Sequence, residues 1–176
     1  KCRWQFPGTW ATRLASSWRI HTDINPRFKT IDQIIEKNLY LSPYVSLGHY
    51  NDMDMLEVGR GLSEDEEKTH FGIWAIMSSP LMIGCDLRTI PEKTLSIITN
   101  QEVIALNQDS LGMQAEVIER GKDYLILSKT IQKREGKLRA VALYNRSNVI
   151  KKIRVDFDKL YLSGKVQVRD LWNHQE

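Results

Sequence analysis

The sequence predicts two parts of different fold class, an α/β part over residues 1–112 and an antiparallel β part over residues 113–176. In the first part, apolar segments alternate with amphipathic helical patterns, which is typical of βα units around a parallel sheet. In the second part, short alternating segments are separated by turns rich in Gly and Asn, which favours antiparallel strands. The charge divides at the same place: residues 1–112 hold 11 Lys and Arg against 14 Asp and Glu, and residues 113–176 hold 14 against 8.

Helix signals in the first part separate three predicted strands. Thr30 and Gln33 fit a capping box, and Ser63 and Glu66 fit a second one with acids in its first turn. Pro80 blocks continuation of the second helix, and Pro91 is placed to open another. The expected strands are 17–24, 48–56 and 81–85, and the expected helices are 11–16, 30–41, 63–79 and 91–107.

The second part is predicted to contain five short strands. Leu125 and Leu127 alternate with neighbouring side chains, and so do Ile153, Val155 and Phe157. Such alternation indicates strands with one buried face, so we expect an antiparallel β-sandwich that lacks its last strands. The expected strands are 115–118, 124–129, 138–144, 150–157 and 166–171.

Acidic residues follow the predicted strands of the first part. Asp23 ends the first strand, Asp52 and Asp54 follow the second, and Asp86 follows the third. In a (β/α)₈ barrel the carboxyl ends of the strands form the active face. Three such units make fewer than half of a barrel, so the sequence predicts the C-terminal part of one.

The carboxylates beside Arg19 suggest two different roles. Arg19 and Asp23 are four residues apart, share one face of a strand, and could form a structural ion pair. Asp52 and Asp54 could cap a loop. Paired carboxylates are also what glycoside hydrolysis requires, one to protonate the leaving oxygen and one to attack the sugar or activate water. The residues alone therefore indicate a site for a sugar or another polar ligand.

Several classes of partner find no support in the sequence. The basic half has no nucleic-acid motif, and the longest uncharged run, residues 71–85, is too short to span a membrane. Cys2 and Cys85 are too few for a disulfide scaffold, and neither lies in a C-x-x-C motif. Calcium-loop spacing is also missing. We expect no metal, no other cofactor, no nucleic acid and no membrane.

Four motifs follow one another along the first part: SWRIHTDI at 17–24, YNDMDMLEVG at 50–59, THFGIWA at 69–75 with SPLMIGCDLR at 79–88, and ALNQDSLG at 105–112. In the same order they resemble segments of glycoside hydrolase family 27, the α-galactosidases and α-N-acetylgalactosaminidases. The first two resemble the family's SWR-x-x-x-D-I and WNDPDMLEVG segments. Residues 69–75 with 79–88 resemble THF-x-x-WA and SPL-x-IG-x-DLR, and residues 105–112 resemble A-x-NQD-x-LG. The resemblance spans most of residues 2–112 and is highly specific.

The resemblance implies a role for each matching residue. It implies a (β/α)₈ barrel followed by a β-sandwich, and Asp23 as the general acid/base of a retaining mechanism. Arg19 would bind the sugar near its 2-hydroxyl, Met55 would pack against galactose, and Cys2 and Trp4 would line the pocket. Asp52 and Asp54 would support the site. The family's nucleophile, an Asp in a YDYCK-like motif, has no match in this chain.

Departures from the family pattern leave alternatives open. Arg3 stands where many members have Glu, Tyr50 replaces Trp and Met53 replaces Pro. The sugar could therefore be galactose, N-acetylgalactosamine or L-arabinopyranose, and a non-catalytic carbohydrate-binding fragment is the alternative outside enzymes. We expect a piece of a longer protein that is inactive alone and forms homo-oligomers. Family members are often exported, which implies a periplasmic or secreted full-length protein.

Overall fold

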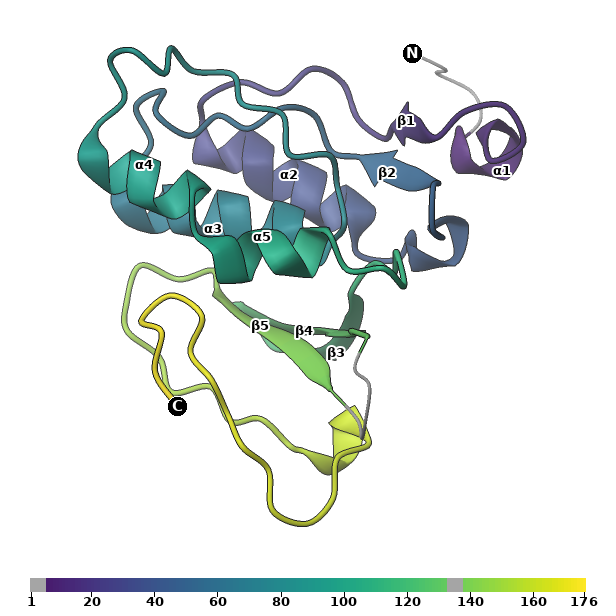
Figure 1. Ribbon diagram of the computed structural model, residues 1–176, viewed down its shortest axis with the longest axis vertical. Helices are drawn as coiled ribbons and strands as arrows, with labels where there is room; N and C mark the ends of the chain where they lie inside the picture. The colour runs from purple at the N-terminus through teal and green to yellow at the C-terminus, as the bar shows by residue number, and fades with distance from the viewer. Residues whose placement is uncertain (1–5, 133–137) are drawn as a thin grey trace.

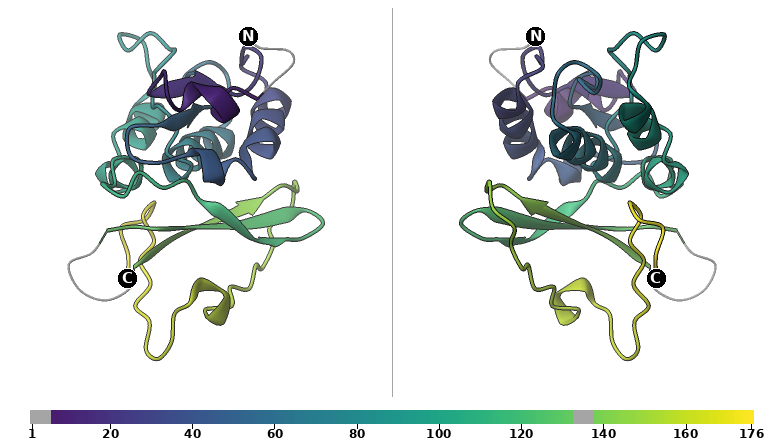
Figure 2. Two further views of the ribbon diagram at one scale, coloured as in Figure 1. Left: turned by 90° about the vertical axis from the view of Figure 1, so that its right-hand side faces the viewer. Right: turned by 90° about the vertical axis from the view of Figure 1, so that its left-hand side faces the viewer.

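The computed structural model describes residues 6–132 and 138–176 and has two layers (Figure 1). Helices α2 to α5 gather around a short parallel strand pair in one layer. An antiparallel sheet of strands β3, β4 and β5 lies against one side of the helices in every view (Figure 2). The segment after β5 runs along the far side of that sheet, and its end returns to the helices, where Arg169 pairs with Glu102 at 2.6 Å. The first part of the chain is thus mixed α/β and the second is antiparallel, as expected.

Two short parallel strands lie in the layer that contains the helices. Strand β1 (Ser17–Arg19) pairs in parallel with β2 (Tyr50–Asp52), and the register places Arg19 opposite Asp52. The expected strand 17–24 is therefore shorter than predicted, although the Ile20 amide still donates to the Asp52 carbonyl at 3.1 Å. Helix α2 (Phe28–Asn38) and the 3₁₀ turn η1 (Ser42–Tyr44) connect the two strands. Helix α1 (Gly8–Ala11) lies earlier than the expected 11–16.

Helix α3 (Glu64–Ile76) starts where the sequence predicted. The Ser63 hydroxyl accepts from the Glu66 amide, and the Glu66 carboxylate accepts from the Ser63 amide, which completes a capping box. The capping box predicted at Thr30 is wrong, because α2 begins at Phe28 and the Thr30 hydroxyl donates to the Asn25 side chain instead. Cap geometry is confirmed at one of the two predicted positions.

The helix predicted over residues 91–107 is two helices, α4 (Glu92–Ile98) and α5 (Gln101–Asn107). Asn100 separates them, since its side-chain oxygen accepts from the amides of Glu102 and Val103 and so starts a new helix. The prediction missed this break because the apolar spacing continues across it.

The segment 81–85 is not the buried strand that its composition predicted. Ile83 forms an isolated parallel bridge with Leu56, and the side chains of Met82 and Ile83 are 49% and 43% exposed. An apolar run shows that a segment can be buried but not whether a neighbour covers it. Among residues 6–132 and 138–176, only this single bridge represents the third predicted strand.

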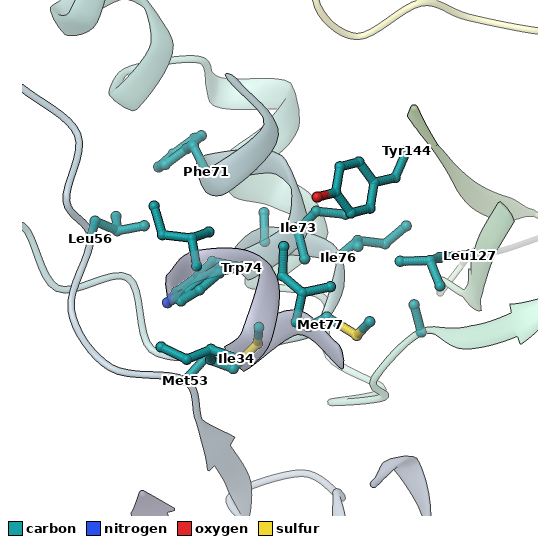
Figure 3. Packing of buried hydrophobic residues seen from close by; sticks show 14 of the residues in the cluster. Ile34, Met53, Leu56, Phe71, Ile73, Trp74, Ile76, Met77, Leu127 and Tyr144 are labelled. Carbon is teal, nitrogen blue, oxygen red and sulfur yellow. The ribbon is translucent and has the colours of Figure 1, made fainter. Parts of the chain in front are cut away.

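The hydrophobic core lies between the parallel strands, α2, α3 and the antiparallel sheet (Figure 3). Trp74 is fully buried at its centre, and its indole nitrogen donates to the Asp54 carbonyl at 2.8 Å. Burying one such large side chain contributes about 2–3 kcal/mol, so this cluster anchors the loop that carries Asp54. Other buried members include Ile31, Ile34, Ile35, Met53, Leu56, Phe71, Ile76 and Met77.

The antiparallel sheet has three strands, β3 (Glu116–Arg120), β4 (Tyr124–Thr130) and β5 (Arg139–Asn145), in that order. Strand β4 lies in the middle, and its pairing with β3 shifts register between Val117 and Glu119. Leu125 and Leu127 are buried, and Figure 3 shows Leu127 and Tyr144 directed toward Ile73 and Ile76 of α3. One face of this sheet therefore covers the helical layer.

Residues 146–176 form one 3₁₀ turn, η2 (Asp158–Leu160), and irregular segments. The strands predicted at 150–157 and 166–171 are wrong, and Ile150 and Val168 are strongly exposed. A strand requires a partner, and alternation alone does not provide one. The described part of the second module is a single sheet rather than two packed sheets.

Candidate active site

The guanidinium group of Arg19 contacts three carboxylates at the end of the parallel strands. Its Nη1 atom forms a close ion pair with Asp54 Oδ2 and lies 3.6 Å from Asp23 Oδ1. Its Nε atom lies 3.5 Å from Asp52 Oδ2. The register of β1 against β2 causes this convergence, since Arg19 and Asp52 are opposite each other. The three carboxylates that the sequence placed at strand ends are thus brought together around one cation.

Asp54 has the most constrained position in this cluster. Its Oδ2 atom accepts from the Ile24 amide at 2.8 Å, and its Oδ1 atom accepts from the Met55 amide at 2.8 Å. Its own amide donates to Asp52 Oδ1 at 2.8 Å. The backbone has φ of +83°, which is unusual for a residue with a side chain. These bonds and the Trp74 indole hold Asp54 in a left-handed conformation.

Asp23 differs from its two neighbours in exposure. Its side chain is 72% exposed, whereas those of Asp52 and Asp54 are 15% and 8% exposed. Ile24, directly after it, is buried and is bonded to Asp54 through its amide. The backbone behind Asp23 is therefore fixed while its carboxyl group remains accessible to a ligand.

Met55 follows Asp54 and lies against Gly84. A Cβ atom on Gly84 would lie 3.0 Å from Met55 Sδ and 3.0 Å from the Leu56 carbonyl oxygen. Glycine at this position allows segment 81–85 to approach the strand end that carries Met55. Met55 is half-buried, and its thioether lies against Gly84.

The aromatic residues near the site are distributed between core and surface. Trp18 is buried, and its indole nitrogen donates to the Asn51 side chain at 2.9 Å, which is a packing role. Trp10 is 42% exposed on α1. The predicted site residues Cys2 and Trp4 lie outside the described residues, as does Arg3.

A buried polar group, to which the sequence analysis assigned no role, lies behind the carboxylates. The Glu57 amide donates to His70 Nε2 at 2.9 Å, and the Glu57 carboxylate pairs with Arg60 at 2.9 Å. Burial raises the pKa of Glu57, whereas Arg60 opposes the shift. Burial also lowers the pKa of His70 to about 3, so this imidazole is neutral at physiological pH. The apolar pair before Glu57 was the only sequence signal for this burial.

A cavity of about 400 Å³ lies at the other end of the parallel strands. Its lining includes Tyr50, the first residue of β2, whereas the carboxylates follow the last residue of that strand. We therefore place the candidate site at the open carboxylate face and not in this cavity. The remaining lining residues are Leu47, Ser78, Ser79, Pro80, Leu81, Asn107, Gln108, Asp109 and Ser110.

Arg19 balances part of the negative charge of the carboxylate cluster. Within the described ranges, no group of three or more His, Cys, Asp or Glu side chains has the geometry to hold a metal ion. Arg19 supplies the positive charge that a metal would otherwise provide to this cluster. No described helix is both long enough and apolar enough to cross a membrane.

Comparison with known proteins shows similarity along nearly the whole chain. Residues 7–109 match the family model described as alpha galactosidase A, and residues 122–176 match the alpha galactosidase C-terminal beta sandwich domain. An alpha-galactosidase of Oryza sativa is 38% identical over 98% of this chain, and alpha-galactosidase 2 of Arabidopsis thaliana is 38% identical over 98%. The matched region is 42% and 44% of those two proteins, so the chain spans under half of their length.

Solved structures of related enzymes have the same fold over this region. Alpha-galactosidase I of Mortierella vinacea superposes with a TM-score of 0.88 at 31% identity, over 96% of this chain and 49% of that one. A family 27 β-L-arabinopyranosidase of Geobacillus stearothermophilus superposes with a TM-score of 0.86 at 30% identity, over 96% of this chain and 41% of that one. From both its sequence and its fold, the chain belongs to the alpha-galactosidase family.

Proposed function

We propose that the Arg19 cluster is part of the sugar-binding and catalytic site of a retaining α-galactosidase. The observation that carries this proposal is the convergence of Asp23, Asp52 and Asp54 on Arg19 at the carboxyl ends of two paired parallel strands. The same edge is the active face of a (β/α)₈ barrel. We propose that residues 1–112 form the C-terminal part of such a barrel and residues 113–176 part of a β-sandwich.

In this proposal Asp23 is the general acid/base. It donates its proton to the glycosidic oxygen as the bond from the anomeric carbon breaks, and a nucleophilic carboxylate outside this chain takes up the sugar. Asp23 then removes a proton from the water that releases the sugar with retained configuration. Its exposed carboxyl group supports this role, because a proton donor must reach a substrate oxygen.

The remaining site residues would bind the sugar. Arg19 has five N–H donors in a rigid fork and would hold a hydroxyl beside the anomeric centre, while Met55 would pack on the apolar face of the ring. Asp52 and Asp54 would orient Arg19. Cys2 and Trp4 would complete the pocket, as the sequence motif suggests. The site would use no metal and no cofactor, and the substrate would be a terminal α-galactoside.

Turnover of an aryl α-galactoside tests the proposal. We expect none from residues 1–176 alone, because the nucleophile has no match here, and activity from a longer polypeptide that supplies it. In that polypeptide, Asp23→Asn should lower kcat at least about 100-fold. Added azide should restore activity on a substrate with a good leaving group and yield an α-galactosyl azide. Asp86→Asn is the matched control, since Asp86 is also an exposed aspartate but pairs with the exposed Arg88.

A second experiment distinguishes galactose from two alternative sugars and an enzyme from a non-catalytic carbohydrate-binding protein. The similarity to a β-L-arabinopyranosidase favours testing L-arabinopyranose, which is galactose without its hydroxymethyl group. Arg3 leaves N-acetylgalactosamine open as well. A panel of the three aryl glycosides should show the galactoside cleaved with the highest kcat/KM. Dominant cleavage of another glycoside would reassign the substrate, and binding without any cleavage would indicate a carbohydrate-binding protein.

We further propose that the 176-residue chain associates with itself and binds neither nucleic acid nor membranes. The exposed apolar side chains of Met82, Ile83 and Leu143 support self-association, because they lie at the edge of a strand segment and on a sheet. Light scattering tests this directly: a stable monomer at micromolar concentration would count against it.

A further inference from the structure

The position of Arg19 presents a chemical difficulty for the proposed acid. A general acid must hold its proton near neutral pH, and a neighbouring guanidinium favours the ionised form of a carboxyl group. Arg19 Nη1 is only 3.6 Å from Asp23 Oδ1. Taken alone, this pair would oppose the function assigned to Asp23.

The other partners of Arg19 remove this difficulty. Asp54 forms the close pair with Arg19, and Asp52 lies on its Nε side at 3.5 Å. Both side chains are largely buried, whereas Asp23 is mostly in water. Charge pairs interact more strongly where water is excluded, so Arg19 is neutralised chiefly by Asp54. The pair with Asp54 therefore weakens the attraction of Arg19 for the ionised form of Asp23.

The same carboxylate of Asp54 also fixes the backbone next to the proposed acid. Its Oδ2 atom is shared by the Arg19 guanidinium and the Ile24 amide, and the Ile24 bond is buried. Asp54 is itself held by the Trp74 indole and by Met55, so it is a rigid acceptor. A single atom therefore links the cation, the chain behind Asp23 and the hydrophobic core.

We propose that Asp54 is a positioning residue, which holds Arg19 away from Asp23 electrostatically and fixes Asp23 through the Ile24 amide. The inference rests on the proposed role of Asp23 as acid/base. The buried Glu57 also interacts electrostatically with Asp54, and its carboxylate forms an ion pair with Arg60. That pair lies behind Asp54 and adds no net formal charge.

The test measures the titration of the Asp23 carboxyl carbon by NMR in the 176-residue chain, without any need for turnover. Asp54→Asn should lower its midpoint by at least about half a pH unit, because Arg19 is released toward Asp23. The Ile24 amide should exchange with solvent faster in the same variant. Arg19→Gln should move the midpoint in the opposite direction, because Asp52 and Asp54 then act without a cation.

The opposite signs distinguish this proposal from general disruption of the site. Asp52→Asn should lower the midpoint less than Asp54→Asn, since its contact is longer, and Asp86→Asn should leave it unchanged. If Asp54→Asn does not fold, the shifts of the Asp23 midpoint in Arg19→Gln and Asp52→Asn still test the proposal, because their expected directions are opposite. An unchanged or raised midpoint in folded Asp54→Asn, or a lowered one in Arg19→Gln, would overturn the proposal.

Failure of this inference and failure of the proposed function have different signatures. The titration reports the charge balance around Asp23 whether or not the protein cleaves galactosides. In an active longer polypeptide, Asp54→Asn should also move the alkaline limb of kcat/KM to lower pH. Normal titration shifts in a polypeptide that cleaves no glycoside would sustain the role of Asp54 and reject the enzymatic assignment.

Discussion

The hydroxyl group of Tyr144, on β5, donates a 2.7 Å hydrogen bond to Asp32 Oδ1 on α2, a residue 112 positions away in the sequence. Arg146 strengthens this junction, because it pairs with Asp32 Oδ2 at 2.7 Å and with Glu36. Arg120 on β3 pairs with Glu36 at 3.1 Å. The antiparallel sheet is thus joined by charge to the helix that follows Asp23.

Tyr144→Phe should lower the free energy of unfolding by about 1–3 kcal/mol, because it removes a donor to a charged, partly buried acceptor. Chemical denaturation followed by circular dichroism measures the change. Tyr124→Phe is the matched control, since its hydroxyl donates to Glu119 within one surface hairpin and joins no second layer. Its cost should stay below about 1 kcal/mol. Equal losses of unfolding free energy in the two variants would show that the bond between the sheet and α2 stabilises the protein no more than a bond within one hairpin.

Gly112→Ala should destabilise the protein more than Gly164→Ala. Both glycines have positive φ, +61° and +78°, so both substitutions introduce similar backbone strain of about 1 kcal/mol. A Cβ atom on Gly112 would also lie 2.6 Å from Leu47 Cα, whereas nothing lies within 4 Å of one on Gly164. The difference in unfolding free energy between the two variants isolates the steric contact. It should exceed about 1 kcal/mol.

Gly84→Ala should displace the Met55 thioether, because the new methyl group would lie 3.0 Å from Sδ. NMR of methionine methyl groups in the 176-residue chain should show a changed Met55 signal. The signals of Met53 and Met113 serve as internal controls, since neither residue is among the nearest neighbours of a Cβ atom at Gly84. In an active longer polypeptide, the same variant should raise KM for an aryl galactoside. A shifted Met55 signal with unchanged KM would separate Met55 from sugar binding.

His70 should make the folded state sensitive to acid. The pKa of His70 is about 3 in the folded protein against an ordinary 6.5, so between these values only the unfolded chain takes up the proton. Stability from this group is complete above about pH 6.5 and is lost as the pH falls toward 3, to a total of a few kcal/mol.

His70→Gln removes this titration while its side-chain oxygen can still accept from the Glu57 amide. The slope of unfolding free energy between pH 3 and 6.5 should therefore become smaller in the variant, whereas His49→Asn, at a partly exposed histidine, should keep it. Comparing slopes, and not absolute stabilities, separates His70 from Glu57, which also titrates in acid. Parallel pH profiles for parent and His70→Gln would contradict the expectation.

Local signals in the sequence predicted those parts of the fold that depend on neighbouring residues in the chain. The capping box at Ser63 and Glu66 is of this kind and is confirmed. The strand predicted at 124–129 is confirmed as well, but its single buried face is not, because residues 125–129 are all buried. The break at Asn100 was missed, because a capping asparagine does not interrupt apolar periodicity. The strand predictions for 81–85, 150–157 and 166–171 are wrong for another reason. An apolar pattern does not show whether another strand lies alongside to pair with the segment.

Sequence analysis likewise predicted one part of the candidate site and missed another. Motif resemblance and strand-end position predicted Asp23, Asp52, Asp54 and Arg19 as neighbours, and the structure brings these four together. The bond from the Ile24 amide to Asp54 joins residues 30 positions apart and depends on a left-handed backbone at an aspartate. No spacing rule predicts such a conformation, so the sequence analysis assigned Asp54 only a supporting role in the site.

The ion pairs on α2 have a consequence for how this protein can change over evolutionary time. Asp32 and Glu36 face the sheet module, and the first turn of the same helix begins five residues after Asp23. Substitutions in the sheet can therefore shift α2 and with it the carboxylate cluster. Substitutions at Arg120 and Arg146 should accordingly be retained mainly when α2 changes with them. Loss-of-function variants in a mutational scan should accordingly extend into a module that contributes none of the proposed sugar-binding residues.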